Sequence, residues 1–259
     1  MRTVSDLNVA ANPCPPTRPC SPTRACSPPT PAGRMPRPVP ASVAIARLAL
    51  FAMLLAGVAG AAAQDRRDPF ETRATPLFDG ESLQGWEGNL KWFRVEQGAI
   101  VAGSLDERIP HNEFLCTTQT FRDFELRLQA RLVGEGNNAG IQFRSRRVPD
   151  SSEVIGYQAD MGAIGDRLIW GALYDESRRR VMLAEPDQRR LRERVRVGGW
   201  NDFRIRCVGN RIQIFLNGER TVDYRETDES IAGEGVIGLQ IHSGAPAEAS
   251  YRNIRILPL

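Results

Sequence analysis

Residues 202–218 read DFRIRCVGNRIQIFLNG, and this stretch decides the fold class. Apolar residues alternate with polar ones on both sides of Gly209-Asn210, which is the period of two that half-buried β-strands show. Asn217-Gly218 then leads into a further run, because Asn-Gly favours the tight turns of β-hairpins. The stretch therefore predicts an antiparallel hairpin that continues into a third strand.

The same alternation recurs from residue 77 onward, with turn residues between the runs and no convincing long helix. Residues 185–194 are expected to form a brief helical turn or a polar loop. Many short strands without long helices predict an all-β fold, a sandwich of two antiparallel sheets. The expected strands are 92–95, 99–102, 114–118, 124–132, 140–145, 156–160, 167–174, 181–184, 202–208, 211–216, 219–224, 235–241 and 249–257.

The first part of the chain has a different composition. Residues 1–34 are crowded with proline, which lacks a backbone donor and restricts its neighbour, so we expect a disordered leader there. Met35 is a plausible alternative start that would leave this leader untranslated. Residues 35–63 have the positive charge, the apolar stretch and the small residues of a secretory signal peptide.

Cleavage between Ala63 and Gln64 would export the protein to the periplasm or the cell exterior. The apolar stretch is shorter than a typical membrane span, although an uncleaved anchor remains the alternative. After cleavage we expect a flexible lead-in over 64–75 and one domain over 76–259, which is long enough for a substantial core.

Two cysteines remain after the expected cleavage site, Cys116 and Cys207. In an exported protein they can form a disulfide, but both lie in apolar runs where buried free thiols are common. The formal net charge is +3, and the arginines alternate with apolar residues instead of clustering. This pattern predicts solvated sheet faces and no nucleic-acid partner.

His242 is one of only two histidines, and it lies on the polar side of an apolar run. Histidine is a common proton-transfer group near neutral pH. Three expected strands carry a polar pair at the same spacing. The pairs are Gln142 with Arg144, Gln158 with Asp160, and Gln240 with His242. If these strands share a sheet, the pairs line one polar groove with donors and acceptors for sugar hydroxyls; the alternative is an ordinary solvent face.

The stretch LFDGESLQGW at residues 77–86 closely resembles the start of the 3-keto-disaccharide hydrolase domain family. Further segments resemble the family in the same order, and together they cover nearly all of residues 76–257. These segments are 112–115, 124–126, 138–145, 156–160, 171–175, 200–201, 216–218 and 238–242. The resemblance implies a jelly-roll sandwich of the concanavalin A-like or laminin-G-like type. It also implies a carbohydrate site on the concave sheet and activity on glycosides oxidised at C3.

Such a substrate gives the polar groups a specific chemistry. A C3 carbonyl acidifies the hydrogen on C2, so a base can remove it and the C1 substituent can leave by β-elimination, after which water can add. We expect His242 to be the base and Arg144 to stabilise the enolate oxygen. Asp160 and Glu113 are candidates to orient His242, to act as an acid or to hold a divalent metal ion.

The expected partner is an oligosaccharide or an oxidised glycoside. Tyr157 and Tyr174 could donate to the leaving oxygen or stack on a sugar, or they could simply pack in the core. A non-catalytic carbohydrate-binding module and a laminin-G-like adhesive domain are the alternative functions. The residues expected to contact substrate are Gln142, Gln158, Gln240, Tyr157, Tyr174, Asn138 and Glu113.

Overall fold

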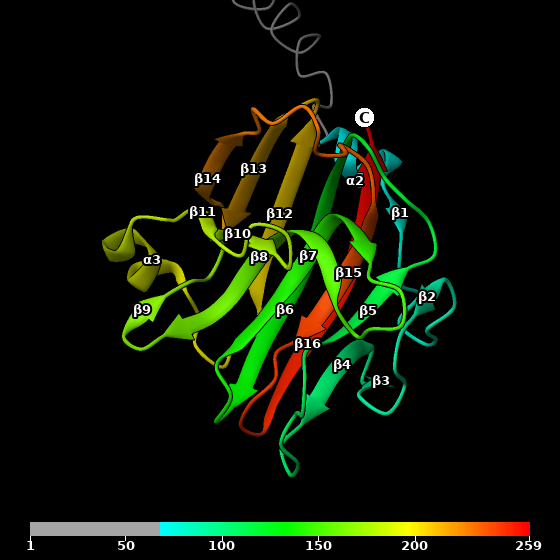
Figure 1. The fold of residues 1–259 in the computed structure, drawn as a ribbon, viewed down its shortest axis with the longest axis vertical. Helices are drawn as coiled ribbons and strands as arrows, with labels where there is room; N and C mark the ends of the chain where they lie inside the picture. Colours follow the sequence, from blue (N-terminus) through cyan, green and yellow to red (C-terminus); the bar gives the residue numbers. More distant parts are fainter. Residues whose placement is uncertain (1–67) are drawn as a thin grey trace, which may run out of the picture. The chain divides into compact units, whose positions relative to one another are not determined.

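The computed structural model describes residues 68–259, so the expected leader, signal peptide and cleavage site lie outside the described residues. Within this range no helix has the length and apolar character that crossing a membrane requires. The chain forms two antiparallel sheets that pack face to face, and this confirms the expected all-β sandwich (Figure 1).

Each sheet combines hairpins of consecutive strands with strands that are distant in the sequence, and all the strand pairs are antiparallel. Sheet I has the order β14 (Glu219–Arg225), β13 (Arg211–Leu216), β12 (Asn201–Val208), β6 (Phe124–Gly134), β16 (Ala247–Pro258), β4 (Ala99–Ser104) and β3 (Phe93–Glu96), with β1 (Thr75–Pro76) beside β16. Sheet II has the order β11 (Met182–Ala184), β10 (Leu173–Glu176), β8 (Val154–Ile164), β7 (Asn138–Arg147), β15 (Val236–Ile241), β5 (Glu113–Thr117) and β2 (Trp86–Glu87), with β9 (Arg167–Leu168) beside β8.

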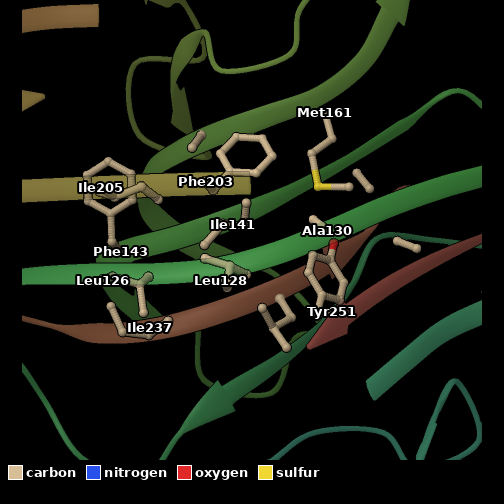
Figure 2. Close-up of a cluster of buried hydrophobic side chains, with 14 of the residues drawn as sticks. Leu126, Leu128, Ala130, Ile141, Phe143, Met161, Phe203, Ile205, Ile237 and Tyr251 are labelled. Atoms are coloured by element: carbon tan, nitrogen blue, oxygen red, sulfur yellow. The ribbon is translucent and has the colours of Figure 1, made fainter. Parts of the chain in front are cut away.

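The core fills the space between the sheets with the apolar residues of each alternating run. Leu126, Leu128 and Ile205 come from sheet I, and Ile141 and Ile237 face them from sheet II (Figure 2). Burial of these side chains leaves their polar neighbours on the outer faces, as the period of two requires. Sheet II therefore presents a polar face that is turned away from sheet I.

Tyr251 of β16 ties the two sheets together at the back of that polar face. Its side chain is fully buried, and its hydroxyl donates to the Gln240 carbonyl at 2.6 Å, with the Gly140 carbonyl at 3.2 Å. A buried tyrosine hydroxyl needs such partners. The contact fixes β15 and β7 against the core at the point where their other faces carry polar side chains.

The expected flexible lead-in is ordered structure from Asp68 on. Residues Pro69–Arg73 form α2, whose first turn is capped by Asp68 accepting the Phe70 N–H at 3.0 Å. Phe70 is buried with the guanidinium groups of Arg127 and Arg255 over its ring, 4.1 and 5.5 Å from the centroid. Phe70 therefore anchors a segment whose other residues are mostly polar.

Three other features differ from the expectations or decide between them. The run 167–174 is interrupted, because a turn at Trp170-Gly171 separates β9 from β10. Residues Gln188–Arg194 form helix α3, with Leu191 as its buried contact. Cys116 and Cys207 are both buried free thiols, which confirms the interpretation from their apolar surroundings over the possible disulfide.

Candidate functional site

Polar residues of four strands converge on a cavity of about 160 Å³ on the polar face of sheet II. Strand register explains the convergence. Tyr174 lies opposite Gln158 on the neighbouring strand, and the His242 N–H donates to the Asn138 carbonyl at 3.3 Å. The cavity is lined by Asn138, Gln158, Asp160, Ile164, Ile169, Tyr174, Glu176, Met182 and His242. Five of the residues expected in the site are therefore brought together.

A row of buried side-chain hydrogen bonds holds Asp160 in place. The Ser145 hydroxyl donates to Gln142 Oε1 at 2.8 Å, Gln142 Nε2 donates to Gln158 Oε1 at 2.8 Å, and Gln158 Nε2 donates to Asp160 Oδ1 at 2.7 Å. Gly140 leaves room for this row, since a Cβ there would approach Gln158 Cδ to 2.3 Å. Gln142 thus supports the cavity from below without lining it.

Asp160 keeps its proton at neutral pH. Burial raises the pKa of Asp160 to about 8, the nearby Glu176 carboxylate raises it further, and the bond from Gln158 opposes the shift. Because Oδ1 already accepts from Gln158, the proton resides on Oδ2. A carboxyl group in this state can donate a proton to a substrate oxygen.

Glu176 is a site residue that the sequence analysis missed. The pair Asp175-Glu176 ends β10, and both side chains are buried. Glu176 Oε2 accepts a hydrogen bond from Gln240 Nε2 at 3.2 Å. Burial and the charge of Glu153 raise the pKa of Glu176, whereas His242 lowers it. Its position two residues after Tyr174, and hence on the same strand face, was the available signal.

The ring of His242 is oriented through its own neighbour in the chain. His242 Nδ1 lies 2.7 Å from the Ser243 carbonyl oxygen, which can only accept, so Nδ1 carries the hydrogen and the lone pair of the neutral ring is on Nε2. The Ser243 N–H in turn donates to Asn112 Oδ1 at 3.0 Å. Asn112 Nδ2 donates to Glu153 Oε1 at 3.3 Å, and the Ser177 hydroxyl donates to Glu153 Oε2 at 2.9 Å.

Two buried acceptors at the site have no hydrogen-bond partner among the described residues, Gln240 Oε1 and Asn138 Oδ1. Buried polar atoms are nearly always paired, so an unpaired acceptor beside a cavity marks a place for a donor from a ligand. Gln240 is fully buried and its amide nitrogen is already used by Glu176. Sugar hydroxyls are donors of the required kind.

Arg144 does not reach the cavity, and its expected role is wrong. Its backbone has a φ of 48°, and the register between β7 and β8 shifts between Phe143 and Arg146. This bulge breaks the alternation that placed Arg144 beside Gln142. The guanidinium instead donates to the carbonyls of Arg122 and Gly209 and to Asp123 Oδ1, each at 2.8 Å.

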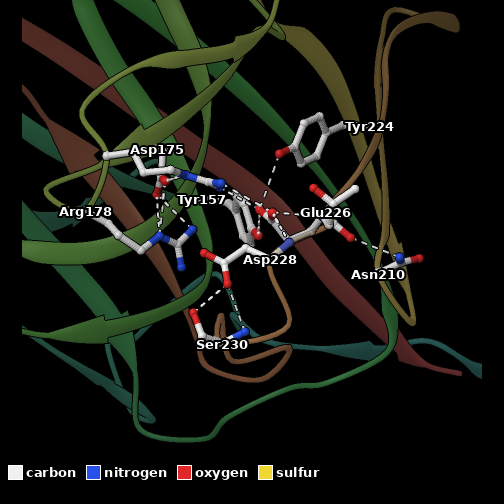
Figure 3. A network of polar contacts seen from close by, with 10 residues as sticks. Tyr157, Asp175, Arg178, Asn210, Tyr224, Glu226, Asp228 and Ser230 are labelled. Atoms are coloured by element: carbon white, nitrogen blue, oxygen red, sulfur yellow. Dashed lines mark hydrogen bonds and ion pairs between the residues drawn. The ribbon is translucent and has the colours of Figure 1, made fainter.

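Tyr157 and Glu113 also lie outside the cavity. Tyr157 faces the core, where it stacks on Phe143 at 5.9 Å, and its hydroxyl donates to Glu226 Oε2 at 2.6 Å in a network of charged groups (Figure 3). Glu113 lies opposite Ile241 and shares its core-facing side of the strand. Its carboxylate accepts from Asn89 Nδ2 at 3.0 Å and pairs with His111 at 3.3 Å.

Asp160 and Glu113 were candidates to hold a divalent metal ion, and of the two only Asp160 lines the cavity. Among residues 68–259 no group of three His, Cys, Asp or Glu side chains is arranged to hold a metal ion. Carboxylate-rich ligand sets are what hard cations such as Ca²⁺ and Mg²⁺ require.

Comparisons with known proteins agree with this architecture. No curated protein sequence matches the chain. A candidate glycosyl hydrolase from Parabacteroides distasonis is similar in fold, with a TM-score of 0.54 at 16% identity over 73% of this chain and 95% of that one. A Bacillus subtilis protein of unknown function with a galectin-like fold has a TM-score of 0.50 at 12% identity, over 71% and 93% of the two chains. A sequence model of the 3-keto-alpha-glucoside-1,2-lyase-like domain matches residues 73–257, and the chain therefore belongs to that carbohydrate-related, glycosyl hydrolase-like family.

Proposed function

We propose that this protein cleaves 3-keto-glycosides by removing the C2 hydrogen and expelling the C1 substituent. One observation carries the proposal: the cavity holds a histidine with its lone pair on Nε2 together with a carboxyl group that keeps its proton at neutral pH. An elimination across C2 and C1 needs such a base and such an acid. Membership of the lyase-like family supports the choice of a 3-keto substrate.

In the first step His242 Nε2 takes the C2 proton, and the electrons of the C–H bond form an enolate with the C3 oxygen. The carboxylate of Glu176 stabilises the imidazolium that results, because unlike charges attract strongly in a site with little water. The amide of Asn138, which is adjacent to His242, donates to the enolate oxygen. Asn138 thereby takes the role that Arg144 cannot fill.

In the second step the enolate electrons form the C1–C2 double bond and the C1–O bond breaks. Asp160 gives its proton to the leaving oxygen, and the Tyr174 hydroxyl donates a hydrogen bond to the same atom. The products are an alcohol and an unsaturated 3-keto sugar. His242 then releases the C2 proton to the solvent and Asp160 regains a proton from water, and addition of a solvent water across C1 and C2 gives the free 3-keto sugar. We place this reaction outside the cytoplasm, on the strength of the signal-like residues 35–63.

The acid is tested by varying the leaving group. Asp160→Asn should lower kcat/KM about 100-fold or more for an alkyl 3-keto-glucoside, which matches typical losses of a general acid. The loss should be small for the 4-nitrophenyl 3-keto-glucoside, because nitrophenolate leaves without a proton. Equal losses for both leaving groups would contradict the assignment of Asp160.

The base is tested with His242→Gln, which keeps a polar side chain of similar reach. Turnover of a 3-keto-glucoside should be lost while binding of the same compound, measured by calorimetry, survives. The unoxidised glucoside should not be turned over by either protein, because its C2 hydrogen is not acidic. A wild-type protein that binds glycans but cleaves no 3-keto-glycoside would be a binding module, and the proposal would be wrong.

A further inference from the structure

The cavity has two chemically different sides. Asn138 and His242 are polar, whereas Ile164, Ile169 and Met182 form an apolar wall beside Asp160 and Tyr174. We propose that this wall is a subsite for an apolar leaving group, an alkyl or aryl alcohol, in preference to a second sugar. The inference rests on the proposed function and adds the class of the leaving group.

The wall adjoins the groups that act on the leaving oxygen. Ile164 lies four residues after Asp160 on β8, so both face the same side of the strand. Met182 of β11 is the direct cross-strand partner of Tyr174 on β10. Asn138 at the start of β7 and His242, the residue after β15, belong to the opposite side of the cavity. A substrate with C2 at His242 and its C1 oxygen at Asp160 therefore extends its leaving group along the apolar wall.

Ile164 is an exposed apolar side chain in the lining of the cavity. Its side chain is 53% exposed, although Ile169 beside it is buried. The surrounding turn is fixed, because the Ile169 N–H donates to the Gly162 carbonyl at 2.9 Å. Gly162 has a φ of 117° and lies against Asn137, so no other residue fits that position without strain. The exposed apolar side chain is thus held at the mouth of the cavity.

Helix α3 braces the same hairpin from the outside. Gln188 Nε2 donates to the Leu168 carbonyl at 2.9 Å, and Gln188 Oε1 accepts the Leu168 N–H at 3.2 Å. Arg192 donates to the Asp166 carbonyl at 2.6 Å. A wall that is fixed before the ligand arrives loses little entropy on binding, which is what a preformed subsite needs.

The chemistry of the wall favours one class of leaving group. A sugar placed there would give up water from its hydroxyls and find no donor or acceptor on Ile164, Ile169 or Met182. An alkyl or aryl group gains affinity instead, about fourfold for each methylene that is removed from water. The lining therefore favours an apolar leaving group over one that carries hydroxyls.

The experiment compares the hexyl and methyl 3-keto-glucosides and the 3-keto disaccharide, because simple alcohols leave with similar ease. In the wild type, kcat/KM for the hexyl 3-keto-glucoside should be at least ten times that for the methyl compound. The kcat/KM for the 3-keto disaccharide should be lower than that for the hexyl compound. Ile164→Ser and Met182→Gln should each reduce the hexyl-to-methyl ratio about fivefold while the methyl substrate changes less than twofold. The controls are Val181→Ser and Val197→Ser, which are exposed apolar residues outside the cavity lining.

Binding to the His242→Gln variant separates this inference from the proposed function. The hexyl 3-keto-glucoside should have a lower dissociation constant than the methyl compound, and the double variant with Ile164→Ser should lose this difference. That result supports the subsite even if the wild type cleaves neither compound. In that case the subsite stands and the proposed reaction fails. Equal binding and equal turnover of hexyl and methyl substrates would overturn the subsite and leave the reaction intact.

Discussion

Among single residues, Asp160 combines a functional role with a cost to stability. Burial raises its pKa from 3.8 to about 8, so the folded protein keeps a proton that the unfolded chain has lost at neutral pH. The folded state binds more protons than the unfolded state between pH 4 and 8, and stability must therefore fall as the pH rises through this window. The buried acid is retained for what its proton can do.

This linkage gives a prediction for Asp160→Asn. The amide has no proton to lose, and its oxygen can still accept from Gln158. The free energy of unfolding of the variant should rise relative to that of the wild type as the pH rises from 4 to 8. The gain should reach about 2 kcal/mol or more at pH 8. Urea unfolding of both proteins at several pH values measures the difference. A difference that does not change with pH would contradict the raised pKa.

For Arg144 we expect a role in stabilising the fold and no role in catalysis. Its side chain is only 3% exposed and donates to two carbonyls as well as to Asp123. Arg144→Met should cost about 2 to 4 kcal/mol of stability, because three acceptors lose their donor. The kcat of the folded fraction should stay within about twofold. Arg146→Met, at an exposed position two residues later, is the control that should change neither quantity.

Between elements, Asn112 links the start of β5 to the chain segment after β15. Its amide holds the Ser243 peptide, whose carbonyl orients the His242 ring, and Glu153 holds the amide. Asn112→Ala should lower kcat about tenfold with little change in KM, because the base loses its orientation while the binding groups remain. His111→Ala is the matched control.

His111 is the neighbouring residue, it is exposed, and it pairs with Glu113 outside the cavity. Its replacement should leave kcat unchanged. Asn112→Asp retains the acceptor for the Ser243 N–H and should recover part of the lost rate. A loss of stability without a change in kcat for Asn112→Ala would show that the residue serves only the fold.

The elements also show why sequence reasoning succeeded and where it stopped. Most strand runs were predicted to within about two residues at each end, since alternation is local and a core enforces it. The exceptions are β8, which extends four residues past the expected 156–160, and the run 167–174, which is split into β9 and β10. The same rule placed Gln158, Asp160 and His242 correctly on one face. It failed at Arg144, because one extra residue in a strand reverses every later side chain and alternation alone does not reveal it.

For the whole molecule, the order of strands within each sheet and the loops that cover them depend on contacts between distant segments. Neither periodicity nor composition shows that Asn112 meets Glu153, or that α3 braces the hairpin of Ile164. The resemblance to a known family supplied the sandwich type, which the two packed sheets confirm, and the family model that matches residues 73–257 confirms the family. The contacts that set the chemistry of the cavity could be identified only from the folded structure.

The central claim is that this cavity removes the hydrogen from C2 of a 3-keto-glycoside. The most direct test is a 3-keto-glucoside that carries deuterium at C2, followed by mass spectrometry against a sample without protein. We predict a primary isotope effect on kcat/KM, loss of the deuterium in every molecule cleaved, and neither event with His242→Gln. Cleavage that retains the deuterium at C2 would contradict the account, because direct displacement at C1 would then be the reaction.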